Sequence, residues 1–201
     1  SINTLASATT YTYTHSNITI NQNYELVITL GGATQSKFFN VMVNPITVNQ
    51  ALSNTLVDGI NYNSDTSKAT LVLDAPGKDF VYVAGSFNNY QPSVNDAMKK
   101  DPTTGKFWLE LTGLTPGVNY NYQYWVVDTT PIAGSPALVK TADPYSTLVL
   151  SPFDDPYIPA STYPNLPAYP AGQEREVTVL KTGEAPYNWQ ATNFNKPKII
   201  R

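Results

Sequence analysis

The chain lacks cysteine altogether and has a single histidine among its 201 residues. Without cysteine it has no disulfide framework and no thiol nucleophile. The lone histidine, His15, has no second histidine and no cysteine to work with, so a clustered zinc site and a histidine-based catalytic triad are both excluded. We expect His15 to be an ordinary surface or strand residue, and we expect no metal and no cofactor.

The chain also carries little charge. It has 12 lysine and arginine residues against 15 aspartate and glutamate residues, which gives a net charge of −3. No run of like charges occurs, so neither a nucleic-acid footprint nor a polybasic membrane patch is present. No apolar stretch approaches the roughly 20 residues that span a bilayer. We therefore expect no nucleic-acid partner and no membrane insertion.

Composition and chain ends indicate an exported protein of which this is a piece. Threonine, asparagine, tyrosine, serine and proline are abundant and there are only 2 methionines, a pattern common in exported β-modules. The first residues lack the charged and apolar regions of a signal peptide, so we expect that a targeting segment was removed or lies upstream. The end at Arg201, directly after two isoleucines, suggests a fragment of a longer protein, with a natural terminus as the alternative.

Apolar alternation with a period of two residues dominates the first three quarters of the chain, and no convincing helical stripe occurs. The pattern predicts an all-β fold. Gly31 and Gly32 separate two of the predicted strands and favour a tight hairpin. The predicted strands cover residues 10–14, 24–30, 37–43, 69–73, 80–83, 106–111, 120–127 and 176–180.

Interruptions of this pattern divide the chain into three parts. Residues 1–52 hold few strands and look like the closing half of an immunoglobulin-like sandwich, which has about seven strands when complete. Residues 53–150 predict a β-sandwich of their own. Residues 151–201 begin with a proline- and tyrosine-rich stretch, and we expect it to lie extended over a surface, because proline fixes its backbone angle and donates no hydrogen bond to a sheet.

The carboxylates give little support for catalysis. Asp154 and Asp155 form the only adjacent pair, and adjacent side chains point apart, whereas a glycosidase needs two carboxyl groups about 5 to 10 Å apart across its substrate. The same pair offers oxygen ligands for a hard cation such as calcium, but no EF-hand spacing supports a site. We expect this chain not to be an enzyme by itself.

Aromatic residues point to recognition instead. The chain has 3 tryptophans and 14 tyrosines, and flat rings stack on the CH groups of a sugar while amides and hydroxyls pair with its hydroxyl groups. Most of these rings are also suited to a core. Alternation along residues 107–111 predicts that Trp108 shares a face with Glu110, so Trp108 is either exposed or covered by another segment. Trp125 is a weaker candidate in the middle of a long strand.

Several spaced motifs carry a family resemblance. They are DAPGK at residues 74–78, VYVAGSFNNY at 81–90, GKFW at 105–108, PG at 116–117, YQY at 122–124 and ADPY at 142–145. In order and spacing they resemble the family 48 carbohydrate-binding module, an early-set immunoglobulin-like β-sandwich that precedes the barrel in starch- and glycogen-acting members of glycoside hydrolase family thirteen. Residues 142–189 are similar to the region that leads into the barrel of secreted bacterial α-amylases.

The resemblance implies a site. The ring at the position of Tyr90 stacks on α-glucan in glucan-binding relatives, with Asn88 and Asn89 beside it, and Trp108 is a further candidate contact. Gln123 stands where relatives have a lysine. The second tryptophan of those relatives falls in residues 129–140, which contain none, so two of three expected contacts are altered.

The resemblance also implies a function and partners. It implies the noncatalytic N-terminal region of a secreted, cell-surface or periplasmic bacterial α-amylase-like hydrolase that binds or positions α-1,4-glucan. The alternative is a structural docking module that braces the catalytic barrel of the same polypeptide, or another partner, without binding sugar. Affinity for starch distinguishes the two.

Overall fold

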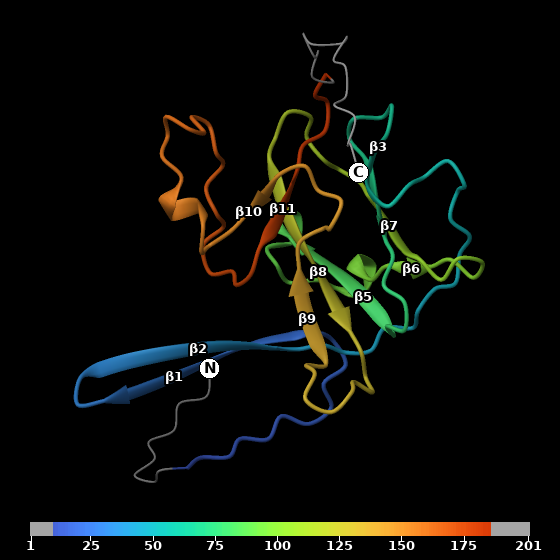
Figure 1. Ribbon diagram of the computed structural model, residues 1–201. Helices are drawn as coiled ribbons and strands as arrows, with labels where there is room; N and C mark the ends of the chain where they lie inside the picture. The colour runs from blue at the N-terminus through green and yellow to red at the C-terminus, as the bar shows by residue number, and fades with distance from the viewer. Residues whose placement is uncertain (1–9, 186–201) are drawn as a thin grey trace, which may run out of the picture.

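The computed structural model describes residues 10–185, and this part of the chain is all-β. Its strands form three antiparallel sheets (Figure 1). The helical elements of the described residues are three short 3-10 turns, η1 (Ser86–Asn88), η2 (Val94–Asp96) and η3 (Asp155–Tyr157). No helix within residues 10–185 has the length and apolar character needed to cross a bilayer.

Two of the sheets make a β-sandwich. One sheet has the strand order β3-β4-β7-β6, and the other has the order β10-β11-β8-β5, with β9 also paired to β8. The strands of the first are β3 (Gly59–Tyr62), β4 (Ala69–Leu73), β6 (Lys99–Lys100) and β7 (Phe107–Leu111). Those of the second are β5 (Phe80–Gly85), β8 (Tyr120–Val127), β9 (Leu138–Thr141), β10 (Val149–Leu150) and β11 (Val177–Leu180).

Strand β8 explains how the sandwich is layered, because both of its faces are buried. Tyr122 and Tyr124 face the other sheet and belong to the inter-sheet core. Trp125 and Val127 point the opposite way, into a second cluster on the outer face of the same sheet. This outer cluster consists of Phe80, Tyr82, Ala84, Tyr90, Trp125, Val127, Leu150, Val177 and Val179, with Met42, Ala97, Leu138, Leu148, Leu166 and Tyr169 packed against it. A sheet buried on both faces needs a third layer of chain above it.

That layer comes from both ends of the described chain. Leu166 and Tyr169 of the proline- and tyrosine-rich stretch pack on the outer cluster, as does Met42 from before the sandwich. The Tyr82 hydroxyl donates a hydrogen bond to the Val43 carbonyl oxygen at 3.0 Å. The stretch therefore lies on this sandwich through Leu166 and Tyr169, but the expectation that it is extended is wrong for much of its length, because residues 152–165 form turns and η3.

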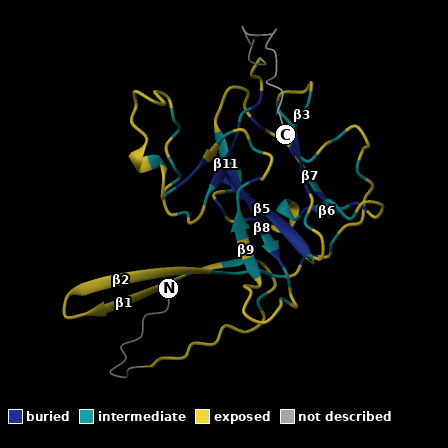
Figure 2. Cartoon of the chain, in the orientation of Figure 1, coloured by how far each residue is buried: buried dark blue, intermediate teal, exposed yellow. Residues whose placement is uncertain are grey.

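The third sheet is a hairpin that projects from the sandwich (Figure 1). It consists of β1 (Gln22–Leu30) and β2 (Ala33–Val41). Gly31 and Gly32 both have positive φ, 57° and 85°, as the glycine pair predicts. Nearly the whole hairpin is exposed, in contrast to the sandwich strands (Figure 2), and Leu30 keeps 83% of its surface in solvent.

Most strand predictions are confirmed, and two expectations are not. The strand at β4 and the long strand at β8 have the predicted bounds. The strand expected at residues 10–14 is wrong, because this stretch has no regular structure. Strand β11 pairs with β8 inside the second sheet, so a sandwich limited to residues 53–150 omits one of its own central strands. The expected features near Arg201 lie outside the described residues.

Candidate functional site

The loop after β5 contains three of the predicted site residues. Hydrogen bonds within the loop and to the end of β5 hold it in place. Asn88 uses both ends of its amide within the loop: its Oδ1 accepts from the Gly85 amide at 2.9 Å and its Nδ2 donates to the Val83 carbonyl oxygen at 2.9 Å. The Tyr90 amide donates to the Gly85 carbonyl oxygen at 2.9 Å. Asn89 is exposed and left-handed, with φ of 53°. Asn88 thus maintains the loop, and of the three predicted site residues in it only Asn89 is exposed.

Gly85 is required by a close approach of backbones. A Cβ at this position would lie 2.6 Å from the Asn121 carbonyl oxygen and 2.8 Å from a ring carbon of Phe87. Both distances are shorter than real Cβ contacts, and the nearer atom belongs to the backbone of β8. The glycine of the GSFNNY motif therefore serves the packing of the sheet.

Tyr90 lies inside the molecule. Only 7% of its surface is exposed, and its ring belongs to the outer cluster. Its hydroxyl donates to Asn121 Oδ1 at 2.5 Å. Burial raises the pKa of this phenol well above its ordinary value. The expectation that the Tyr90 ring offers a face to a sugar is wrong for this structure, because protein atoms already cover that face.

Gln123 is also buried and holds a turn of the chain. Its Nε2 donates to the carbonyl oxygens of Glu174 and Glu176 at 2.6 and 3.0 Å, with a longer contact to that of Arg175 at 3.3 Å. Its Oε1 accepts from the Trp125 indole at 3.3 Å. Gln123 therefore fixes the residues that lead into β11, and it has no surface left for a ligand.

Arg175 has a positive φ of 69°, an unfavourable backbone region for a non-glycine residue. The Tyr169 hydroxyl also donates to its carbonyl oxygen, at 2.6 Å. Two side chains therefore secure this turn, Gln123 from β8 and Tyr169 from the proline- and tyrosine-rich stretch.

Trp108 is partly covered, as one of the two alternatives anticipated. Its indole Nε1 donates to the Gln50 carbonyl oxygen at 2.9 Å, and Lys99 Nζ lies 4.5 Å from the ring centroid. Phe107 and Leu109 point into the inter-sheet core while Glu110 is exposed, as the alternation predicts. Trp125 is fully buried. The Trp125 indole therefore presents no face to solvent, whereas the Trp108 indole is only partly covered.

The ADPY and YQY motifs meet in the inter-sheet core. Asp143 is buried, and its Oδ2 accepts hydrogen bonds from the hydroxyls of Tyr122 and Tyr124 at 2.8 and 2.9 Å. Its Oδ1 accepts from the Tyr145 amide at 2.8 Å. Burial raises the pKa of both phenols well above the ordinary value. The sequence identified these motifs but gave no sign that they bond to one another.

The remaining polar candidates are separate from each other. His15, in the irregular segment before the hairpin, has its Nδ1 2.5 Å from the hydroxyl of Tyr24 on β1, and both side chains are exposed. Asp154 Oδ2 accepts from the Ser151 hydroxyl at 3.0 Å. Within residues 10–185, no three His, Cys, Asp or Glu side chains gather as metal ligands would.

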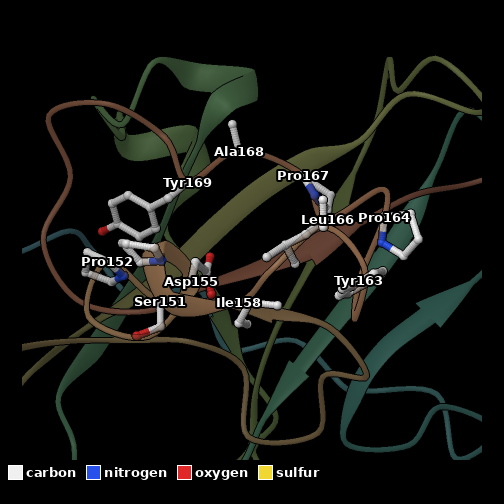
Figure 3. Close-up of a pocket in the computed structure, with 12 residues that line it drawn as sticks. Ser151, Pro152, Asp155, Ile158, Tyr163, Pro164, Leu166, Pro167, Ala168 and Tyr169 are labelled. Atoms are coloured by element: carbon white, nitrogen blue, oxygen red, sulfur yellow. The ribbon is translucent and has the colours of Figure 1, made fainter.

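A pocket of about 470 Å³ lies in the proline- and tyrosine-rich stretch, between Ser151 and Tyr169 (Figure 3). Its lining contains four prolines, two tyrosines, Ile158, Leu166 and one charged side chain, Asp155. Asp155 Oδ2 is buried and has no hydrogen-bond partner among the described residues. The sequence predicts that this stretch covers a surface. The pattern of prolines and tyrosines does not predict a pocket within it.

Comparison with known proteins gives partial likenesses. No family model and no curated protein matches the chain. Among solved structures, the Group B Streptococcus pullulanase SAP in complex with maltotetraose is 23% identical over 51% of this chain, with a TM-score of 0.36. The catalytic module of the glycogen-degrading pneumococcal virulence factor SpuA is 20% identical over 47% of this chain, with a TM-score of 0.36. The chain spans 13% of the length of each, and likenesses at this level assign no family.

Proposed function

We propose that this chain is a noncatalytic module of an α-glucan-active glycoside hydrolase and that it binds or positions α-1,4-glucan for a catalytic barrel in the same polypeptide. The observation that carries the proposal is that motifs of the family resemblance, which are far apart in the sequence, contact and hydrogen-bond one another in the folded chain. The solved structures named above are described as a pullulanase and a glycogen-degrading protein, which is the same substrate class, but their likeness is too low to carry the argument.

These contacts form a framework that connects motifs far apart in the sequence. Gly85 and Asn88 of GSFNNY shape the loop that packs on β8. Tyr122 and Tyr124 of YQY bond the carboxylate of Asp143 in ADPY. A chance match of short motifs gives no reason for their residues to meet, whereas a shared sandwich design does. These contacts support the resemblance to the family 48 carbohydrate-binding module and with it an exported bacterial enzyme.

Two structural observations favour the alternative function, in which the module docks on the catalytic barrel or another partner. Tyr90 and Gln123, two of the expected sugar contacts, are buried in internal bonding. The projecting hairpin exposes Leu26, Ile28 and Phe39 on one face, and exposed apolar surface is typical of contact with another domain. A module that braces the barrel without touching sugar remains the second candidate function.

Affinity electrophoresis separates the two candidates. The purified chain is run in gels that contain soluble starch and in matched gels that contain dextran. Glucan binding predicts retardation in starch alone. Equal mobility in both gels would contradict glucan binding and leave the docking role. Any starch hydrolysis by the purified chain would contradict its noncatalytic assignment.

A further inference from the structure

We propose that the pocket between Ser151 and Tyr169 is a glucan-binding subsite in which Asp155 accepts hydrogen bonds from sugar hydroxyls and Tyr163 and Tyr169 provide apolar ring surface. This inference rests on the proposed function and gives it a location. The proposed sugar contact then lies in residues 151–169 and not in the loop after β5, where the Tyr90 ring is buried. The family resemblance assigns no ligand to residues 151–169.

The pocket is held in shape by the sandwich. Leu166 and Tyr169 line the pocket and also pack on the outer cluster. The Tyr169 hydroxyl is bonded to the Arg175 carbonyl oxygen at 2.6 Å, a group that Gln123 also contacts. Such anchoring fixes the lining before a ligand arrives, so less conformational entropy is lost on binding.

Asp155 supplies a polar group that lacks a partner. Its Oδ2 is shielded from solvent and accepts no hydrogen bond from the described residues, although buried carboxylate oxygens are ordinarily satisfied. Because the terminal torsion of aspartate is broad, a partial rotation about it would bring Oδ2 to the pocket surface. A ligand hydroxyl donated to this carboxylate would remove the cost of the unpaired oxygen.

The rest of the lining selects the chemistry of the ligand. Figure 3 shows Tyr169 and Tyr163 on opposite sides of the pocket, with Asp155 between them in this view. Tyr163 keeps 40% of its surface exposed, and no lysine or arginine lines the pocket. The absence of a cation from this lining disfavours phosphates and other anions. A neutral sugar suits it, since its CH groups pack on rings and prolines and its hydroxyls donate to one carboxylate.

The size of the pocket agrees with this assignment. Its volume of about 470 Å³ lies within the range of about 300 to 1,000 Å³ that is usual for small-ligand sites.

Calorimetric titration with maltoheptaose tests the subsite on the whole chain. Asp155→Leu removes both acceptor oxygens while keeping the branching of the side chain, and Tyr163→Ala removes an exposed ring. Each is expected to weaken maltoheptaose binding about tenfold or more, the effect of losing one good polar or stacking contact. Asp155→Asn keeps one acceptor oxygen and is expected to bind between wild type and Asp155→Leu.

Matched controls lie outside the pocket. Asp74→Leu changes an exposed carboxylate on another loop, and Tyr157→Ala changes a ring of the same stretch that is 85% exposed. Both should bind like wild type. Thermal unfolding adds a second readout: Asp155→Leu should leave Tm unchanged or raise it, because an unpaired oxygen is removed, whereas a residue with a structural role would lower Tm.

Each outcome bears on a distinct claim. If wild type binds maltoheptaose and the Asp155 and Tyr163 variants bind equally well, the subsite is overturned and the proposed function stands. If wild type binds neither maltoheptaose nor starch, glucan binding itself is overturned and the subsite with it. Selective loss in the two pocket variants supports both.

Discussion

The loop after β5 and the stretch from Ser151 to Tyr169 contain the same kinds of residue but differ in how their polar groups are used. In the loop, Asn88 bonds with both ends of its amide and the Tyr90 hydroxyl is bonded to Asn121. In the stretch, Asp155 has an oxygen with no partner and the Tyr163 ring is partly in solvent. Polar groups whose hydrogen bonds are all made within the protein stabilise the fold. A polar group without a partner beside the pocket is a candidate to bind a ligand.

The largest predicted effect is a loss of stability at alkaline pH, where the buried tyrosines ionise. The pKa values of Tyr90, Tyr122 and Tyr124 are raised by burial, and burial raises that of Tyr169 to about 12. Unfolded tyrosines ionise near pH ~10, so the stabilising effect is fully present below that value and is lost as the pH rises through the higher folded pKa values.

We therefore expect the free energy of unfolding in urea to be flat up to about pH 9 and to fall steeply above about pH 10. Phenolate absorbance followed together with circular dichroism checks this. Tyr120, whose pKa is lowered by the hydrogen bond from Thr115, should ionise before the sandwich unfolds. Ionisation of all tyrosines with no loss of β-structure would contradict the account.

Truncation of the two compared tyrosines should lower the stability by very different amounts. Tyr90→Ala empties part of the outer cluster and is expected to cost about 3 to 5 kcal/mol of stability. Tyr163→Ala, at a partly exposed ring, should cost about 0.5 kcal/mol. Urea unfolding of both variants measures the difference. Equal losses would remove the distinction between framework and site.

Gln123→Leu should loosen the turn that the glutamine holds. The change leaves the carbonyl oxygens of Glu174 and Glu176 without this donor and is expected to cost about 1 to 3 kcal/mol. Hydrogen exchange followed by mass spectrometry should show faster exchange in the peptide that contains β11. Unchanged exchange there would mean that the Tyr169 hydroxyl alone secures the turn.

Among the variants of the buried framework, the smallest effect is expected from Tyr90→Phe, which removes only the hydroxyl bonded to Asn121. It should cost about 1 kcal/mol and leave retardation in starch gels unchanged. Loss of retardation without loss of stability would return the sugar contact to this loop.

Most strands of the fold could be predicted from the sequence, because the alternation of apolar and polar residues in a strand is a property of that strand alone. The bounds of β8 follow from its own pattern, and the hairpin follows from Gly31 and Gly32, whose positive φ values suit its turn. Strands β6 and β10, of two residues each, are too short for a pattern to form. The membership of β11 in the sandwich is set by pairing with β8 over a long separation, which alternation does not encode.

The candidate site was less predictable for a related reason. The motif placed Tyr90 at the end of a polar loop, but its orientation depends on Asn121, 31 residues further along the chain. The same applies to Gln123, whose partners lie near residue 175. Asp155 was considered as half of a carboxylate pair, and its unpaired oxygen becomes apparent only when the surrounding prolines and tyrosines are in place.

The most direct measurement is a titration of the 15N-labelled chain with maltoheptaose, followed by amide chemical shifts. Glucan binding in the pocket predicts concentration-dependent shifts that centre on residues 151–169, with the amides of residues 85–91 unmoved. Shifts that centre on residues 85–91, with the amides around Asp155 unaffected, would contradict it.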